Sequence, residues 1–302
     1  MTRSPFFYVG DKYKLMNQLL DYFPSNINRL IEPFSGGGSV FINTKANEYL
    51  ENDNNTYMIR LHKFLFSFKD KRESFFNRFE KTIMKYGLSA SYLGVNVPDE
   101  LKEKHVKTYY AVYNKQAYND IKRDFNANKK NMMLLYILLI YGFNHMLRFN
   151  NSGDFNLPVG NVDYNKNVVT ALNDYFDFVD SHNVIFSNLD FEKFIKKIKF
   201  KEGDFLYLDP PYLISSSEYN KYWTENEEKR LLKLLDQLNE QGIKFALSNV
   251  LEHKGRKNDL LDEWAKKYNK IKITSNYISF NDNTVKETTK EVLITNYGNS
   301  TI

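Results

Sequence analysis

Hydrophobic and polar positions follow different periods in three successive parts of the chain. Near the start, short apolar runs bounded by turn residues predict strands at 27–33 and 48–53. From about residue 56 to 183 the pattern becomes helical and rich in Lys, Phe, Tyr and Asn. Strand patterns then return between helical stretches such as 226–242, and they cover 183–190, 204–212, 243–249, 271–280 and 291–297. Strands separated by helical crossovers predict an α/β sheet, whose closing strands could pair antiparallel.

Three consecutive glycines, at 36–38, follow the first predicted strand, and the sequence SVFINTKAN at 39–47 predicts a helix after them. The second strand ends at Asp53, 21 positions beyond Glu32. This spacing is typical of nucleotide-binding folds, in which the glycines admit a ligand close to the backbone and the acid binds ribose hydroxyls. A Walker lysine is missing, so the segment is not a phosphate-binding P-loop. The plainer alternative is a tight turn followed by a solvated strand end.

The middle of the chain predicts an inserted, mostly helical domain at 57–183, between two parts of a sheet domain at 1–56 and 184–302. Its longest apolar run, near 133–143, is about half of what a membrane span needs, so we expect a buried helix there. The polar, glycine-containing stretch at 148–167 predicts an ordered loop. A length of 302 residues fits one core with a sizeable insertion.

Composition narrows the class of protein. A hydrophobic content of 42% predicts a folded chain with a substantial core. The absence of cysteine excludes disulfides and thiolate metal sites, and we expect no metal site. The chain does not open with the pattern of a signal peptide, which predicts a cytoplasmic location without membrane association. The formal charge of +5 is compatible with a polyanionic partner but is weak evidence for one.

The strongest local signal is Asp209-Pro210-Pro211-Tyr212, placed where the strand GDFLYL gives way to a loop. Two prolines stop the strand and fix the backbone, which presents a carboxylate and an aromatic ring at the carboxyl edge of the sheet. The carboxylate and the proline carbonyl can accept the hydrogens of a planar amine, while the ring stacks on the attached heterocycle. The alternative is a strand-ending turn with a half-buried tyrosine.

Taken in order, these segments resemble the Dam-like family of DNA adenine methyltransferases. The matching segments are 7–15, 32–41, 51–53, 142–160, 209–212, 248–250 and 291–297. The resemblance implies a Rossmann-like S-adenosylmethionine-dependent methyltransferase sheet with an inserted, mostly helical target-recognition domain. It also implies transfer of a methyl group from S-adenosyl-L-methionine to the N6 amine of adenine in double-stranded DNA.

The resemblance assigns roles to residues of this sequence. The implied catalytic residues are Asp209, Pro210 and Tyr212. The implied cofactor-binding residues are Tyr8, Lys12, Phe34, Gly36, Gly38, Asp53, Asp190 and Asp209. Asp190 begins an ordinary strand-to-helix junction, so capping of that helix is as good an interpretation as cofactor contact.

The target amine is inaccessible inside a duplex, so the adenine is expected to flip into the pocket and stack on Tyr212. The implied DNA-binding residues are Asn144, Met146, Arg148, Pro158 and Lys286. Arg148 matches a position that reads guanine, as a bidentate guanidinium can. Structural alternatives remain: a helix cap for Asn144, core packing for Met146, turn rigidity for Pro158 and ordinary hairpin polarity for Lys286 and Lys290.

Four residues depart from the pattern of GATC-methylating relatives. Phe7 and Tyr8 replace a basic residue and a tryptophan, Asp11 replaces a glycine, and Asn161 stands where an arginine often follows. These differences argue against recognition of GATC, although Arg148 keeps a guanine in the site plausible.

The resemblance also implies a monomer that works in restriction-modification, alongside an endonuclease that shares its site without stable association. Other activities stay open: transfer to cytosine N4 or to adenine in RNA, and a catalytically silent nucleic-acid-binding module. A NAD-dependent oxidoreductase would need GxGxxG in the required form and would leave Asp209 to Tyr212 without a role.

Overall fold

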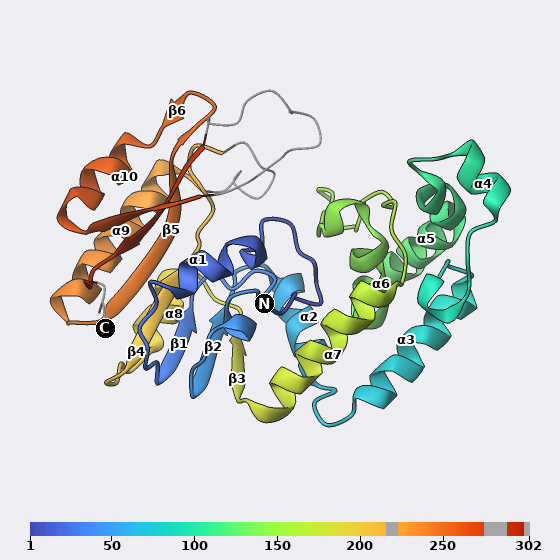
Figure 1. The fold of residues 1–302 in the computed structure, drawn as a ribbon, viewed down its shortest axis with the longest axis horizontal. Coiled ribbons are helices and arrows are strands. Elements are labelled where there is room, and N and C mark those ends of the chain that lie inside the picture. The colour runs from blue at the N-terminus through green and yellow to red at the C-terminus, as the bar shows by residue number, and fades with distance from the viewer. Residues whose placement is uncertain (216–222, 275–288, 299–302) are drawn as a thin grey trace.

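The computed structural model describes residues 1–215, 223–274 and 289–298, which form an α/β molecule with a central sheet (Figure 1). The sheet has the order β3-β2-β1-β4-β5-β8-β7, with β6 paired to β5. The strands are β1 (Arg29–Glu32), β2 (Glu48–Asn52), β3 (Val184–Ser187), β4 (Asp204–Leu208), β5 (Lys244–His253), β6 (Arg256–Lys257), β7 (Asn269–Ile273) and β8 (Thr289–Thr295). The strands predicted at 27–33, 48–53, 183–190, 204–212, 243–249 and 291–297 are therefore confirmed, with bounds that differ by a few residues. The strand predicted at 271–280 is confirmed only in its first residues, which belong to β7, and residues 275–280 lie outside the described residues.

Pairing within the sheet is parallel from β3 to β5 and antiparallel beyond it. Parallel strands carry buried residues on both faces, as in β1 and β4, where every residue is buried. The antiparallel pairing of β5 with β8 and of β8 with β7 confirms the expectation for the closing strands. Because β1, β2, β3 and β4 run in one direction, the loops that follow them gather at one edge of the sheet.

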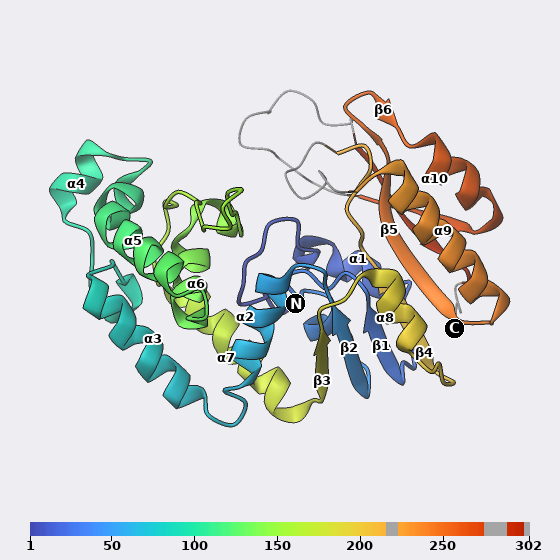
Figure 2. The ribbon, with the colours of Figure 1, turned by 180° about the vertical axis from the view of Figure 1, so that it is seen from behind.

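Helices cover both faces of the sheet and fill the segment between β2 and β3. They are α1 (Met16–Leu20), α2 (Thr56–Phe66), α3 (Arg72–Tyr86), α4 (Asp99–Lys104), α5 (Tyr109–Ala127), α6 (Met132–Tyr141), α7 (Lys166–Ser181), α8 (Phe191–Lys197), α9 (Glu225–Glu240) and α10 (Asp259–Trp264). Figure 2 shows α8 and α9 in front of the sheet, and α3, α4 and α5 on the far side of the molecule from β5. The predicted helices at 226–242 and 133–143 correspond to α9 and α6. Within the described residues, none of these helices is long and apolar enough to span a membrane.

The two faces of the sheet bury two different sets of side chains. Residues such as Ile31, Leu206 and Leu247 pack with α8, α9 and α10 on one face. On the other face, Leu30, Tyr49, Phe205 and others belong to a buried cluster that continues without interruption into α2, α3, α5, α6 and α7. In α6, every residue from Met133 to Tyr141 is buried. The inserted helices therefore share one continuous core with the sheet.

The helix predicted at 39–47 is wrong: a 3₁₀ turn at Phe41–Asn43 stands in its place. Polar side chains compete with the helical hydrogen bonds in this segment. Asn43 Nδ2 donates to the Ser39 and Thr2 carbonyls, and Thr44 Oγ1 donates to the Val40 carbonyl. Thr44 itself is extended, with φ −106° and ψ 128°, so the chain turns directly toward β2.

Candidate active site

A cavity of about 860 Å³ opens where the loops after β1, β2, β3 and β4 meet. Such a volume is in the range of pockets that enclose a cofactor-sized ligand. Twelve of the residues predicted for the site line it: Tyr8, Lys12, Phe34, Gly36, Gly38, Asp53, Met146, Arg148, Asp190, Asp209, Pro210 and Tyr212. They come from the N-terminal segment, the sheet edge and the insertion, so the fold brings together positions that are far apart in the sequence.

Asp209 stands just past the end of β4 and is contacted by two other residues of the site. Lys12 Nζ lies 2.9 Å from Asp209 Oδ2, and the Tyr212 hydroxyl donates a 2.8 Å hydrogen bond to Asp209 Oδ1. Lys12 is buried, and its Nζ also lies 5.2 Å from the centroid of the Tyr212 ring and 3.9 Å from Glu291 Oε1. The carboxylate of Asp209 therefore lies between an ammonium group and a hydroxyl, and it has further lone pairs that can accept hydrogen bonds from an amine.

The glycine turn after β1 is held by Asp53 and by His62. The Gly36 amide donates to Asp53 Oδ2 at 3.0 Å, and His62 Nε2 lies 2.8 Å from the Gly36 carbonyl oxygen. Burial raises the pKa of Asp53, and the amides of Asn55 and Gly36 oppose that rise. Burial lowers the pKa of His62 to about 4, so the ring is neutral and its Nε2 proton is available for the carbonyl.

Close packing explains two of the three glycines in this turn. A Cβ at Gly37 would come within 2.8 Å of the Tyr8 Cβ, and one at Gly38 would come within 2.3 Å of the Phe41 ring. Gly38 also has a φ of +77°, which L residues rarely adopt. The glycines thus allow Tyr8 and Phe41 to approach the turn.

Several buried polar atoms beside the turn have no hydrogen-bond partner among the described residues. They are Oε1 of Glu32 and the hydroxyls of Ser35 and Ser39, all on residues that line the cavity. Such atoms usually have a partner, and a polar ligand would supply one. With the carboxylate of Asp53 nearby, this donor and acceptor set fits a cofactor with hydroxyl and amine groups.

Glu32 and Glu51 form a buried pair of acids behind the cavity, because they are register partners on β1 and β2. Burial first, and then the charge of Asp209, raises the pKa of Glu32 well above its ordinary value. Burial and Glu32 have the same effect on the pKa of Glu51. In both acids the rise in pKa favours the uncharged form of the carboxyl group.

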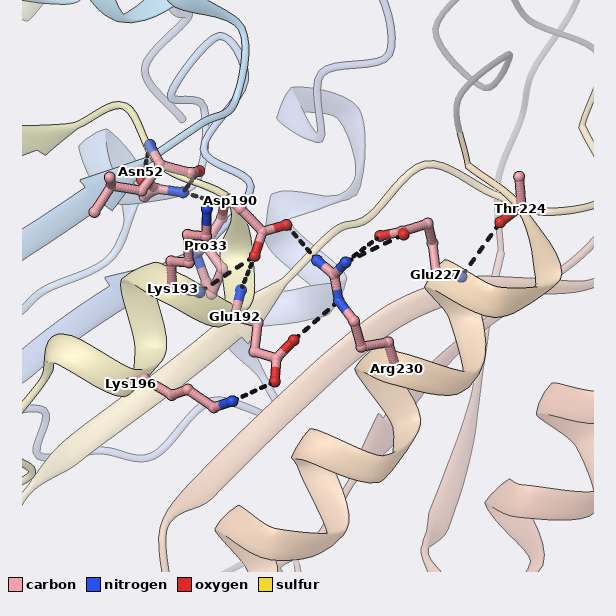
Figure 3. Close-up of polar contacts among 10 residues, drawn as sticks. Pro33, Asn52, Asp190, Glu192, Lys193, Lys196, Thr224, Glu227 and Arg230 are labelled. Carbon is pink, nitrogen blue, oxygen red and sulfur yellow. Dashed lines mark hydrogen bonds and ion pairs between the residues drawn. The ribbon is translucent and has the colours of Figure 1, made fainter.

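Asp190 caps α8, the first of its two expected roles. Its Oδ1 accepts the backbone N–H groups of Glu192 and Lys193 at 3.1 and 3.2 Å, while Oδ2 forms an ion pair with Arg230 (Figure 3). Arg230 also contacts Glu192 and Glu227, each at 3.1 Å, and its guanidinium lies 4.4 Å from the centroid of the Phe191 ring. Asp190 lines the cavity, so capping and cofactor contact do not exclude each other.

Three aromatic rings form one wall of the cavity, and of these only Phe34 was predicted from the sequence. The rings of Phe34, Phe191 and Trp223 lie 5.3 to 5.8 Å apart. The Trp223 indole donates a 2.6 Å hydrogen bond to Glu228 Oε2, which fixes the ring beside the amino end of α9. Burial raises the pKa of Glu228, and its hydrogen-bond donors oppose that rise. The sequence shows a lone Trp before an acidic helix start, a signal too weak to assign alone.

On the insertion side of the cavity, hydrogen bonds to Asn156 orient the Arg148 guanidinium. Arg148 Nε and Nη2 donate to the side-chain and backbone oxygens of Asn156 at 3.0 and 2.7 Å. The Arg148 carbonyl accepts from the Asn156 amide at 3.0 Å, and Phe149 pairs with Phe155 in a β-bridge. A side chain oriented in this way presents its remaining N–H groups with little rotational freedom.

Of the other predicted DNA-binding residues, one lines the cavity, two lie outside it and one is outside the described residues. Asn144 is exposed with φ +52°, and Pro158 is exposed with its carbonyl bonded to the Phe143 amide; neither lines the cavity. Met146 is half-buried, packs against the core and lines the cavity. Lys286 lies outside the described residues. Their roles in binding DNA stay predictions.

Two further residues named from the sequence have structural partners. Asn161 Oδ1 accepts the backbone N–H groups of Tyr110 and Ala111, so it caps α5 from a distant loop. Lys290 Nζ pairs with Glu252 at 2.5 Å. In the described ranges, no group of three or more His, Asp or Glu side chains is arranged to hold a metal ion.

The sheet order, with the glycine turn and Asp53 beside one cavity at the carboxyl edge, defines an α/β protein with an open ligand-sized site at that edge. More particularly, the chain belongs to the D12 class N6 adenine-specific DNA methyltransferase family, whose model matches residues 8–278. The match confirms the Dam-like resemblance and the methyltransferase fold class, and it leaves no place for the oxidoreductase alternative.

Relatives of the chain include a type II methyltransferase, a modification methylase and a DNA adenine methylase. It is 36% identical to the type II methyltransferase M.FokI of Planomicrobium okeanokoites and 34% identical to the modification methylase StsI of Streptococcus sanguinis. Each match covers 99% of this chain and 43% of the relative, so the chain spans less than half the length of these two proteins. It is also 24% identical to a DNA adenine methylase of Vibrio cholerae, over 80% of this chain and 79% of that protein.

Proposed function

We propose that this protein transfers a methyl group from S-adenosyl-L-methionine to the exocyclic N6 amine of an adenine flipped out of double-stranded DNA. The observation that carries the proposal is the position of Asp209 and Tyr212 in one cavity with the glycine turn on one side and Arg148 on the other. A methyl donor and a target base need adjoining subsites, and this cavity offers both.

The residues around the glycine turn are proposed to bind the cofactor. Asp53 would accept the ribose hydroxyls, and the ring of Phe34 would pack against the adenosine. Tyr8, Lys12, Gly36, Gly38 and Asp190 complete the proposed cofactor set. The bound cofactor would supply an electrophilic methyl group on a positively charged sulfur.

Asp209 and the carbonyl of Pro210 are proposed to accept the two hydrogens of the target amine. This arrangement turns the nitrogen lone pair toward the methyl group, and the Tyr212 ring stacks on the base. The Tyr212 hydroxyl already bonds to Asp209, so ring and carboxylate act as one rigid unit. As the bond from N6 to the methyl carbon forms, the bond from that carbon to sulfur would break and leave a neutral thioether. The methylated nitrogen then loses one proton, for which Asp209 is the proposed acceptor.

The inserted segment 57–183 is proposed as the target-recognition domain. Arg148 would read a guanine in the major groove, with Asn144, Met146, Pro158 and Lys286 as neighbouring contacts. The relatives named modification methylases support a role in restriction-modification, beside an endonuclease that recognises the same site. We further propose that the protein acts as a monomer in the cytoplasm.

Transfer to cytosine N4 or RNA adenine remains the chemical alternative, because the same carboxylate and ring would hold either amine. The test is methyl transfer from labelled S-adenosylmethionine to mixed-sequence duplex DNA, followed by base-resolved mapping of modified positions. We expect methylated adenine in one short context, and no transfer with Asp209→Ala, whose fold should stay intact by circular dichroism. Label on cytosine or only on RNA would select the alternative, and full activity of Asp209→Ala would overturn the mechanism.

A further inference from the structure

The strand β5 is longer than its parallel neighbours and continues past them. It pairs with β4 only over residues 244–247, and its remaining residues to His253 pair with β8 and β6. The chain then turns back through Lys254 and Gly255 into β6 (Figure 1). Residues 252–257, called here the basic hairpin, therefore project beyond the sheet edge at which the cavity opens.

The turn of the basic hairpin is a rigid one. Lys254 and Gly255 have φ values of 48° and 77°, the handedness of a two-residue turn that matches the twist of the paired strands. Lysine rarely adopts this conformation, and Asn or Gly at its position would hold the turn with less strain. The turn therefore places the charge of Lys254 at the tip of the hairpin in a fixed backbone conformation.

Three positive charges on this hairpin stand beside a single carboxylate, that of Glu252, the register partner of Lys257. Lys254, Arg256 and Lys257 are exposed, and none of them forms an ion pair within the part of the chain that the structure describes. The carboxylate of the hairpin, Glu252, is paired with Lys290 of β8. Besides burial, the charges of Lys254 and Arg256 lower the pKa of His253. Like charges brought this close favour an anionic partner.

The basic hairpin also stands at the cavity. His253 and Lys254 line it together with Asp209, while Arg148 and Asn151 line it from the insertion. A duplex whose base enters the cavity must pass between these two sides. About half or more of protein–DNA hydrogen bonds go to the sugar-phosphate backbone, so basic side chains at the rim of this cavity stand where such contacts would form.

We propose that the basic hairpin is a phosphate-binding arm, in which Lys254, Arg256 and Lys257 contact the backbone of the DNA substrate. This inference rests on the proposed function and adds to it a contact surface outside the insertion. The contact is independent of base sequence, so it strengthens binding to every duplex alike.

The test compares DNA binding by the wild-type chain with a triple variant, Lys254→Asn, Arg256→Gln and Lys257→Gln. The Lys254→Asn change places an Asn-Gly pair at the turn, which keeps the hairpin while removing the charge. The matched control removes three exposed lysines at the opposite edge of the sheet, two just ahead of β2 and β4 and one at the first position of β5, namely Lys45→Gln, Lys201→Gln and Lys244→Gln. Binding to a labelled mixed-sequence duplex is measured by fluorescence anisotropy between about 50 and about 200 mM salt.

For the hairpin variant we expect the slope of log K against log salt to become shallower by about 0.9 for each phosphate that the arm no longer neutralises, with affinity about tenfold weaker near 100 mM salt. The control variant should match the wild type, and all three proteins should bind S-adenosylmethionine equally. A hairpin variant with unchanged slope and affinity, in a protein that methylates DNA, overturns this inference alone. A wild-type chain that binds no DNA overturns the proposed function with it.

Discussion

His62 should make the protein less stable in mild acid, and the structure gives the size of the effect. The ring lies in the core, stacked on Phe186 with centroids 5.0 Å apart, and Nε2 meets the Gly36 carbonyl at 2.8 Å. Burial lowers its pKa from 6.5 to about 4. Between pH 6.5 and pH 4 the unfolded chain binds a proton at His62 that the folded chain does not. The free energy of unfolding is therefore highest above pH 6.5 and decreases as the pH is lowered below that value. The full loss corresponds to about 3.4 kcal/mol.

The perturbation is His62→Gln, which keeps an N–H donor for the Gly36 carbonyl and removes the titration. The free energy of unfolding is measured by urea denaturation of both proteins from pH 7.5 to 4.5. We expect the wild type to lose about 2.5 kcal/mol more free energy of unfolding than His62→Gln when the pH is lowered across this range. Glu32 and Glu51, whose pKa values burial raises, act in the opposite direction. They do so in both proteins, so the comparison removes them. The reasoning would be refuted if the free energies of unfolding of the two proteins changed equally with pH, or if NMR showed that His62 of the folded protein titrates near pH 6.5.

Three further outcomes are expected. Arg148→Ala should lower discrimination between the preferred site and single-base variants by about tenfold or more, as measured by competition methylation, because a bidentate contact is worth about 1–3 kcal/mol. Gly38→Ala should lower the thermal midpoint and the cofactor affinity together, because its Cβ would lie 2.3 Å from the Phe41 ring; unchanged calorimetry would contradict this. Arg230→Met should raise the cofactor KM by about two- to fivefold, through the half-exposed ion pair with Asp190, whereas the control Lys196→Gln should not.

Much of the sheet was predictable because the buried strands are short apolar runs between turn residues. The same holds for α6, where nine successive buried residues leave no alternative to a core helix. The helix predicted at 39–47 was wrong because the apolar spacing of this segment fits a helix, whereas the side chains of Asn43 and Thr44 donate hydrogen bonds to nearby carbonyls and the turn ends early. A periodic pattern does not contain this competition between side chain and backbone.

The motif residues of the site were predictable as individuals, but their partners were not. Asp209 was named from its tetrapeptide, and Lys12 from a resemblance near the start of the chain. Their 2.9 Å contact, and the approach of Glu291 to the same lysine, join three segments that are distant in sequence. Likewise, the link from Arg230 to Asp190 depends on how α9 lies beside α8, which no local pattern encodes.

The continuous core has a consequence for engineering and for divergence. An insertion with its own core could be exchanged between relatives as a cassette, bringing a new target sequence with it. Here α2, α3, α5, α6 and α7 bury their side chains in the same cluster as β1 and β2, and the Tyr136 hydroxyl bonds to the Pro5 carbonyl. A graft of residues 57–183 would therefore cut through packed side chains. The exchangeable unit is the surface loop that carries Arg148, whose hydrogen bonds to Asn156 travel with it.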